Sequence, residues 1–184
     1  MPDAAQPARQ TEPVQAAQRS EPDPSGRPAQ TGQPAQATRA TAPPVVLFLC
    51  VHNAGRSQMA AAWLDRLAAG RVEVLSGGSA PGQALNPRAV AVMAERGIDL
   101  RRRRPRAWTP ADLARADVVV TMGCGDQCPY VPGKRYEDWP VADPADAELE
   151  AVRAIRDAIE QRVRGLLASL EQEGATEPSP AAPT

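Results

Sequence analysis

A cysteine and an arginine separated by five residues stand where an apolar run gives way to a helical one. Cys50 ends the apolar run 45–50, Arg56 and Ser57 follow, and helical character begins near Gln58. A strand, a short loop and a helix N-terminus together direct backbone N–H groups at a bound oxyanion. The positive potential of such a loop favours the thiolate of Cys50, the nucleophilic form of its side chain. The pattern predicts nucleophilic attack on a tetrahedral oxyanion.

The remaining loop residues are expected to bind the anion or hold the loop in shape. Arg56 would bridge two anion oxygens through its planar guanidinium. Ser57 either donates its hydroxyl to the thiolate or caps the following helix, and the two roles are compatible. Asn53 tolerates left-handed backbone angles, whereas His52 is expected to face solvent without a catalytic role. The predicted substrate-binding residues are Val51, His52, Asn53, Ala54, Gly55, Arg56 and Ser57.

A leaving oxygen needs a proton, so chemistry at this loop calls for a carboxylic acid nearby. The candidates are Asp138, Asp143 and Asp146. Asp143 is the best placed, because Pro144 stiffens the loop after it and directs its side chain back toward the site. The alternative for Asp143 is a solvated turn aspartate.

Two further cysteines form a second chemical feature. Cys124 and Cys128 lie four positions apart, and the first is flanked by Gly123 and Gly125. This spacing is within disulfide reach, which requires about 4.4–6.8 Å between the Cα atoms. A redox pair is favoured over a zinc site, because structural zinc usually takes four well-spaced ligands. We therefore predict no metal ion and no cofactor.

Composition narrows the class of protein. The 184 residues carry a net charge of −1 and three cysteines, an odd number that favours cytoplasmic thiol chemistry over a disulfide framework. No segment has the length and apolar character of a membrane span.

The basic run 101–106 is most simply a solvated loop. Attraction of anions toward the site is an alternative interpretation, and nucleic-acid binding is the least favoured one. We expect a cytoplasmic monomer that binds neither nucleic acid nor membranes.

Helical and strand-like segments alternate between two polar tails. Residues 1–43 and 171–184 are rich in Pro, Ala and polar residues and are expected to be disordered, because they bury too little apolar surface. A single domain is expected over 44–170. The predicted strands are 45–50, 72–76, 117–122 and 134–139. The predicted helices are 57–69, 86–96, 109–114 and 145–170. In the second of these, Asn86 is the expected N-cap and Pro87 the first helical residue.

This alternation predicts an α/β domain whose small parallel sheet, of about four strands, is flanked by helices. Ligands of such sheets bind beyond the carboxyl ends of the strands, at a switch in strand order. The loops that begin at Cys50 and Gly123 both follow strand ends. We expect them to meet over one site.

The segment 50–60 resembles the anion loop of arsenate reductases built on the low-molecular-weight protein tyrosine phosphatase fold. The resemblance runs from about residue 45 to 170 and includes the segments 86–89, 118–122, 124–129 and 143–145. Because the loop and the cysteine pair occur together, the chain is most similar to the three-cysteine, thioredoxin-coupled form. The loop alone would also suit a phosphatase.

The resemblance implies reduction of arsenate to arsenite in arsenic detoxification. Cys50 would attack arsenic while Asp143 protonates the departing oxygen. Cys124 would then attack the Cys50 sulfur and release arsenite, and Cys128 would attack Cys124. Thioredoxin would reduce the final Cys124–Cys128 disulfide by thiol–disulfide exchange. The alternatives are a low-molecular-weight protein tyrosine phosphatase, a reductase that uses mycothiol and mycoredoxin, and a non-enzymatic redox sensor.

Two positions differ from the patterns of related proteins. Some relatives hold a monovalent cation whose acidic ligand would fall near Ala61, where this chain has no carboxylate. The run 101–106 occupies the region of other ligands, so no such cation is expected. Gln58 weighs against the phosphatase alternative, because the phosphatase loop usually continues with proline after the serine.

Overall fold

The computed structural model describes residues 42–124, 128 and 130–176, and most of the two predicted tails lies outside this part of the chain. The described elements are β1 (Val45–Cys50), α1 (Arg56–Ala68), β2 (Glu73–Gly78), α2 (Pro87–Ala94), α3 (Pro110–Arg115), β3 (Val118–Thr121), β4 (Arg135–Asp138) and α4 (Leu149–Thr176). The four strands form one parallel sheet in the order β2-β1-β3-β4. The predicted fold class is confirmed.

The strand order contains a reversal at the centre of the sheet. From β1 the chain passes through α1 to β2 on one side, then returns through α2 and α3 to β3 on the other side. This reversal creates a switch point at the carboxyl ends of β1 and β3. The loops after Cys50 and Thr121 both leave the sheet at that edge, and the N–H of Met122 donates to the carbonyl of Leu49 at 2.8 Å.

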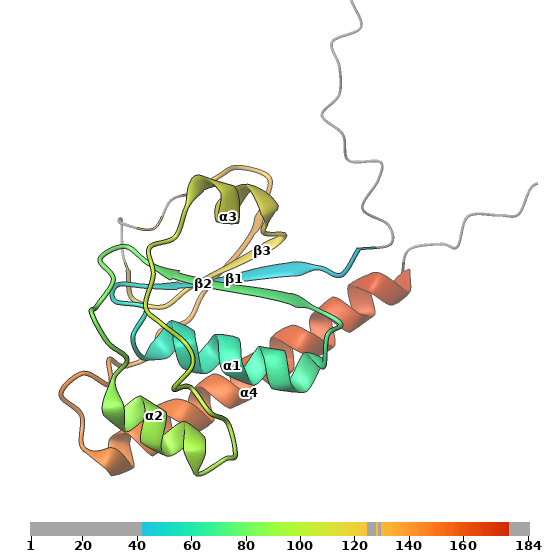
Figure 1. Ribbon diagram of the computed structural model, residues 1–184. Coiled ribbons are helices and arrows are strands. Elements are labelled where there is room, and N and C mark those ends of the chain that lie inside the picture. The colour runs from blue at the N-terminus through green and yellow to red at the C-terminus, as the bar shows by residue number, and fades with distance from the viewer. Residues whose placement is uncertain (1–41, 125–127, 129, 177–184) are drawn as a thin grey trace, which may run out of the picture. The chain divides into compact units, whose positions relative to one another are not determined.

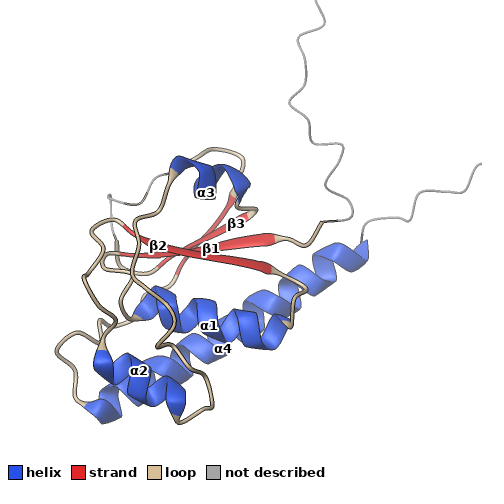
Figure 2. Ribbon diagram, in the orientation of Figure 1, coloured by secondary structure: helices blue, strands red, loops and turns tan. Residues whose placement is uncertain are grey.

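Helices cover both faces of the sheet (Figures 1 and 2). α1, α2 and α4 lie on one face, and the short α3 lies on the other. Every residue of β1 is buried: Val46 and Phe48 face the larger helical layer, while Leu47 and Leu49 face the smaller one. This alternation has the period of two of a strand buried on both sides.

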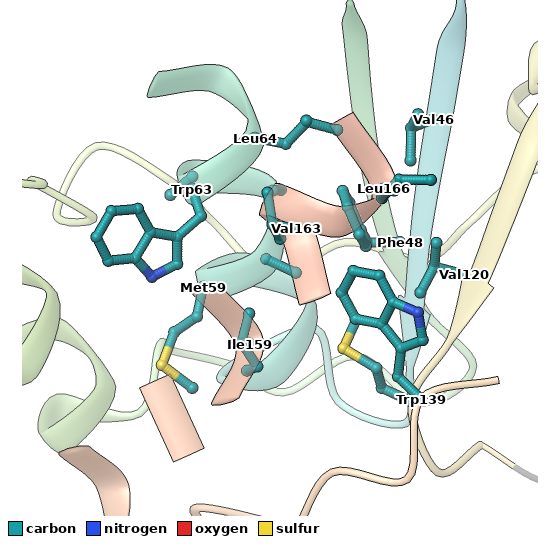
Figure 3. Packing of buried hydrophobic residues seen from close by; sticks show 14 of the residues in the cluster. Val46, Phe48, Met59, Trp63, Leu64, Val120, Trp139, Ile159, Val163 and Leu166 are labelled. Carbon is teal, nitrogen blue, oxygen red and sulfur yellow. The ribbon is translucent and has the colours of Figure 1, made fainter. Parts of the chain in front are cut away.

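The larger core packs α1 and α4 against β1 (Figure 3). Phe48 of β1, Met59 of α1 and Ile159 of α4 are fully buried. Trp139 follows β4 and places its ring centroid 5.7 Å from that of Phe48, at a tilt of 57°. Burial of each such side chain stabilises the fold by about 1.5–3 kcal/mol. Packing in this layer therefore fixes the start of α1 relative to the end of β1.

The last helix continues beyond its predicted end at Leu170. Glu171 pairs with Arg71, and Glu173 pairs with Arg135 at 2.6 Å. The apolar periodicity that predicted this helix stops at Leu170. The last turns of α4 are held by ion pairs instead, so the apolar pattern could not predict them. Among the described helices, none is both long enough and apolar enough to cross a membrane.

One buried arginine joins α4 to the end of α2. Arg156 is 4% exposed and donates to the carbonyl of Val92 and to Glu95 and Asp157, at 2.9, 2.9 and 2.7 Å. Its hydrogen bond is the main reason that the pKa of Asp157 lies below its usual value. The hydrogen bond from Arg153, with a smaller contribution from Arg156, lowers the pKa of Glu95. Arg156 thus satisfies a carbonyl of the last turn of α2 and holds two carboxylates in their charged form.

Replacing this arginine should destabilise the domain. Arg156→Met is expected to lower the free energy of unfolding by about 2 kcal/mol, because it removes hydrogen bonds that involve charged groups. Arg164→Met removes an exposed ion pair with Glu160 and should change stability by no more than about 0.5 kcal/mol. Urea denaturation followed by circular dichroism measures both, and equal losses would contradict the assignment.

Stability should also fall in acid. The ordinary pKa values are 4.5 for Glu95 and 3.8 for Asp157, and both are lowered in the fold. The folded chain therefore binds fewer protons than the unfolded chain in this range, so the free energy of unfolding decreases as the pH falls through the lowered values. In Arg156→Met this decrease should be smaller. Urea titrations at several pH values measure it, and an unchanged pH dependence in the variant would refute the explanation.

Candidate active site

The loop between β1 and α1 encloses the sulfur of Cys50. The N–H of Asn53 donates to Cys50 Sγ at 3.2 Å, and the Oγ of Ser57 lies 3.0 Å from the same sulfur. Asn53 has a φ of 48°, the left-handed conformation expected for it. The N-cap of α1 is Gly55, without a side-chain hydrogen bond. Of the two predicted roles of Ser57, the contact with the cysteine is the one present.

The hydrogen bonds around this sulfur have a defined direction. The Nδ2 of Asn53 donates to Ser57 Oγ at 2.8 Å. The hydroxyl of Ser57 accepts this bond, so its own hydrogen is available to Cys50. Cys50 is buried and is a free thiol. Its sulfur therefore faces two donors, which stabilise a thiolate.

The predicted anion-binding arginine is paired with the predicted acid. The guanidinium of Arg56 donates to Asp143 Oδ2 at 2.5 Å, and the side chains are 8% and 46% exposed. The other oxygen of Asp143 accepts the N–H of Ala145 at 3.1 Å. Asp143 therefore lies at the anion loop rather than in a remote turn. The alternative candidate Asp138 instead accepts a hydrogen bond from Thr121 at 2.7 Å.

A cavity of about 150 Å³ opens at this point. Its walls include several predicted site residues, namely Cys50, His52, Ala54, Gly55, Arg56 and Asp143. Val51, Asn53 and Ser57, also predicted to bind substrate, are not among the described residues that line it. The volume suits an anion of a few atoms and is below the range of about 300–1,000 Å³ found for drug-sized ligands.

Two glycines permit neighbouring segments to approach the loop. A Cβ on Gly55 would lie 2.7 Å from Pro144 Cγ, and one on Gly123 would lie 2.6 Å from an Arg56 nitrogen. Gly123 also has a φ of +70°, which side chains rarely adopt. Arg56 therefore lies between the segment that carries Asp143 and the loop that leads to the cysteine pair.

Asn86 has a role that sequence reasoning missed. Its side-chain oxygen accepts the N–H groups of Arg88 and Ala89, which confirms the predicted N-cap of α2. Its Nδ2 also donates to the carbonyl of Pro144 at 3.1 Å, and its backbone N–H donates to the carbonyl of Ala54 at 2.9 Å. Asn86 thus ties the segment that carries the predicted acid to the anion loop. The N-cap could be predicted from neighbouring residues in the sequence. The hydrogen bond to Pro144, 58 positions away, could not.

The cysteine pair forms a disulfide beside the anion loop. The Cα atoms of Cys124 and Cys128 are 5.7 Å apart, within the predicted range. Cys124 is 5% exposed and packs with Leu49 in the smaller core, whereas Cys128 is half-buried. Residues 125–127 and 129 lie outside the described part of the chain. Of the cysteines, only Cys50 lines the cavity in the described structure.

Acidic side chains pair with much of the basic run. Arg101 pairs with Asp99 at 2.9 Å. Arg106 pairs with Asp112 at 2.7 Å and lowers the pKa of that carboxyl group. The backbone N–H of Arg106 also donates to the side-chain oxygen of Asn53 at 3.0 Å. The run therefore contacts the anion loop through its backbone.

Comparison with known proteins places the chain in a family. The sequence profile of the low molecular weight phosphotyrosine protein phosphatase family matches residues 45–176. The chain belongs to this family. One relative is the glutaredoxin arsenate reductase of Synechocystis sp. (strain ATCC 27184 / PCC 6803 / Kazusa). It is 34% identical to this chain over 128 residues, which cover 68% of this chain and 97% of the relative.

The structure of this chain resembles solved structures of arsenate reductases and of phosphatases. A thioredoxin-dependent arsenate reductase of Corynebacterium glutamicum has a TM-score of 0.62 and 40% identity, over 71% of this chain and 63% of that chain. The chain thus spans less than two thirds of that protein. The YwlE arginine phosphatase of Geobacillus stearothermophilus has a TM-score of 0.67 and 28% identity, over 74% of this chain and 99% of that chain. Proteins with this fold therefore catalyse different reactions.

A substitution at Gly123 should weaken oxyanion binding by displacing Arg56. Gly123→Ala is expected to reduce the affinity for inorganic phosphate by about tenfold, because charge-assisted hydrogen bonds from the guanidinium are misplaced. Gly133→Ala is a matched control, since Gly133 has a φ of +84° but nothing within 4 Å of an added Cβ. Isothermal titration calorimetry measures both affinities. Equal losses in the two variants would contradict a specific role for the contact with Arg56.

Proposed function

We propose that this chain reduces arsenate to arsenite, with Cys50 as the nucleophile and the pair Cys124 and Cys128 as the source of electrons. One observation carries the proposal: the same domain holds a free cysteine in an anion loop and a disulfide next to that loop. Hydrolysis of a phosphoester requires the first feature only. The arsenate reductases among the relatives and similar structures support the proposal.

The first step is attack on the bound anion. Arsenate, a tetrahedral oxyanion, enters the cavity above Cys50 and draws the guanidinium of Arg56 away from Asp143. The Cys50 thiolate attacks arsenic, and an arsenic–oxygen bond breaks. Asp143, released from its ion pair, takes a proton from the bound dihydrogen arsenate anion and passes it to the departing hydroxyl group, which leaves as water. Arsenic remains in its oxidised state, now bonded to sulfur.

Reduction of arsenic follows when a second cysteine attacks the sulfur of Cys50. The thiolate of Cys124 attacks the sulfur of Cys50, a disulfide forms, and the electron pair of the broken sulfur–arsenic bond remains on arsenic, which leaves as arsenite. The thiolate of Cys128 then attacks Cys124 and regenerates the Cys50 thiolate. The two electrons come from Cys124 and Cys128. A free Cys50 together with a Cys124–Cys128 disulfide corresponds to the end of this sequence.

The disulfide must be reduced before a second turnover, and thioredoxin is the proposed reductant. Cys128 is half-buried while Cys124 is buried, so an external thiol has readier access to the sulfur of Cys128. Tyr130 lies two positions further on and is 73% exposed, which offers apolar surface to a protein reductant. The similar Corynebacterium structure bears the name of a thioredoxin-dependent enzyme. A glutaredoxin-type protein or mycothiol with mycoredoxin is the alternative donor.

A phosphatase is the second candidate function, favoured by the similarity to the Geobacillus arginine phosphatase. Such a reaction would use Cys50, Arg56 and Asp143 in the same positions. It would leave Cys124 and Cys128 without a part in turnover. For this reason it ranks below the reductase.

The decisive experiment follows NADPH consumption by thioredoxin and thioredoxin reductase after addition of arsenate and catalytic amounts of the protein. Sustained, arsenate-dependent consumption is expected for the unaltered chain, and Cys124→Ser and Cys128→Ser should each abolish it, because each removes one step of the relay. If Cys124→Ser leaves the turnover unchanged, the reductase mechanism is wrong.

Hydrolysis of p-nitrophenyl phosphate by the same variants provides the comparison. Efficient hydrolysis that is unaffected by both serine substitutions, without arsenate turnover, would favour the phosphatase. If thioredoxin fails and mycoredoxin with mycothiol succeeds, the reductase stands and the proposed partner is wrong.

A further inference from the structure

Gln58, the third residue of α1, is a buried amide close to the anion loop. Its side chain is 2% exposed, and its Nε2 donates to the Oδ1 of Asn53 at 3.0 Å and to the carbonyl of Arg104 at 3.2 Å. The opposite amide orientation would place an oxygen against these two acceptors, so the direction of the amide is determined. Its Oε1 has no hydrogen-bond partner in the described structure. Burial of that oxygen is costly, and an apolar side chain would avoid the cost.

The amide of Gln58 is the start of a directional series of hydrogen bonds. The Oδ1 of Asn53 accepts from Gln58 and also from the N–H of Arg106, at 3.0 Å in each case. Two donors at this oxygen turn the Nδ2 of Asn53 toward Ser57, to which it donates at 2.8 Å. Ser57 in turn lies 3.0 Å from the sulfur of Cys50. Each group is therefore oriented by the one before it.

We propose that Gln58 is a positioning residue: together with the backbone of residues 104–106, it fixes Asn53 so that the hydroxyl hydrogen of Ser57 points at the sulfur of Cys50. The proposal rests on the proposed function only in taking Cys50 as the nucleophile. It also gives a role to the basic run 101–106. That role belongs to a carbonyl and an N–H group of its backbone. The guanidinium groups of Arg101, Arg103 and Arg106 pair with carboxylates instead.

Loss of the Gln58 amide should make the thiolate less favourable. Without the Nε2 donor, Asn53 retains a single hydrogen bond at its oxygen and is free to turn away from Ser57. The hydroxyl of Ser57 then loses the donor that occupies its oxygen, so its hydrogen is no longer restricted to the sulfur. A thiolate that loses a hydrogen-bond donor is less populated at a given pH.

The oxidised protein allows a direct measurement of this effect. Cys124 and Cys128 are joined, so Cys50 is the only free thiol among the three cysteines of the chain. The rate of alkylation by iodoacetamide as a function of pH then reports the Cys50 thiolate alone, without arsenate or reductant. Gln58→Leu is expected to move this profile upward by about one pH unit, a tenfold slower reaction on its rising limb. Gln161→Leu, exposed on α4, is the matched control and should leave the profile unchanged.

A double-substitution cycle separates positioning from a general loss of structure. Ser57→Ala should shift the profile by itself, and Gln58→Leu should add nothing in that background, because the effect of Gln58 passes through Ser57. If Gln58→Leu does not fold, Gln58→Met replaces it in the same cycle. An unshifted profile in the folded Gln58 variant, or additive shifts in the double variant, would overturn the proposal. A failed arsenate assay with a shifted profile would instead count against the proposed function alone.

Discussion

The proposed reaction requires two negative groups, a thiolate and an oxyanion, to be held together at the end of β1, and the rest of the structure is arranged around that requirement. The chain meets it with hydrogen-bond donors that are in place before any anion arrives, and with one cation that Asp143 holds nearby. The N–H of Asn53 and the hydroxyl of Ser57 serve the sulfur, while Arg56 serves the anion. Fixed donors need a rigid support. The rigid support comes from β1, which is buried on both faces, and from α1, which packs against β1 in the larger core.

Arg56 connects the two chemical features of the domain. It forms an ion pair with Asp143 on one side and lies against Gly123, next to Cys124, on the other. A buried cation without a partner is costly, so the Asp143 carboxylate stabilises the site when no anion is bound. In the proposed mechanism, a bound oxyanion replaces Asp143 as the partner of Arg56, and Asp143 is then free to transfer a proton. One ion pair thus couples occupation of the site to the availability of the acid.

Local patterns in the sequence were sufficient to predict the fold and the position of the loop between β1 and α1. The apolar run ending at Cys50 predicted β1, and Asn86 with its following proline predicted the start of α2, because both signals lie within a few residues. The contact of Gln58 with the carbonyl of Arg104, across 46 positions, could not be predicted in this way. Hydrogen bonds between distant segments follow from the packing of the chain and leave no periodicity. The same holds for the contact between Asn86 and Pro144.

The small cavity has a consequence for chemical selectivity. Its walls include the guanidinium of Arg56, and its volume suits a small oxyanion. Phosphate and arsenate are both tetrahedral oxyanions of this size, so the two anions should compete for one place. For the proposed reaction, discrimination then arises after binding. The electron pair of a broken sulfur–arsenic bond can remain on pentavalent arsenic, which is readily reduced, whereas phosphorus in phosphate resists reduction. Phosphate would be a reversible inhibitor, and the rate in a cell would depend on the ratio of the two anions.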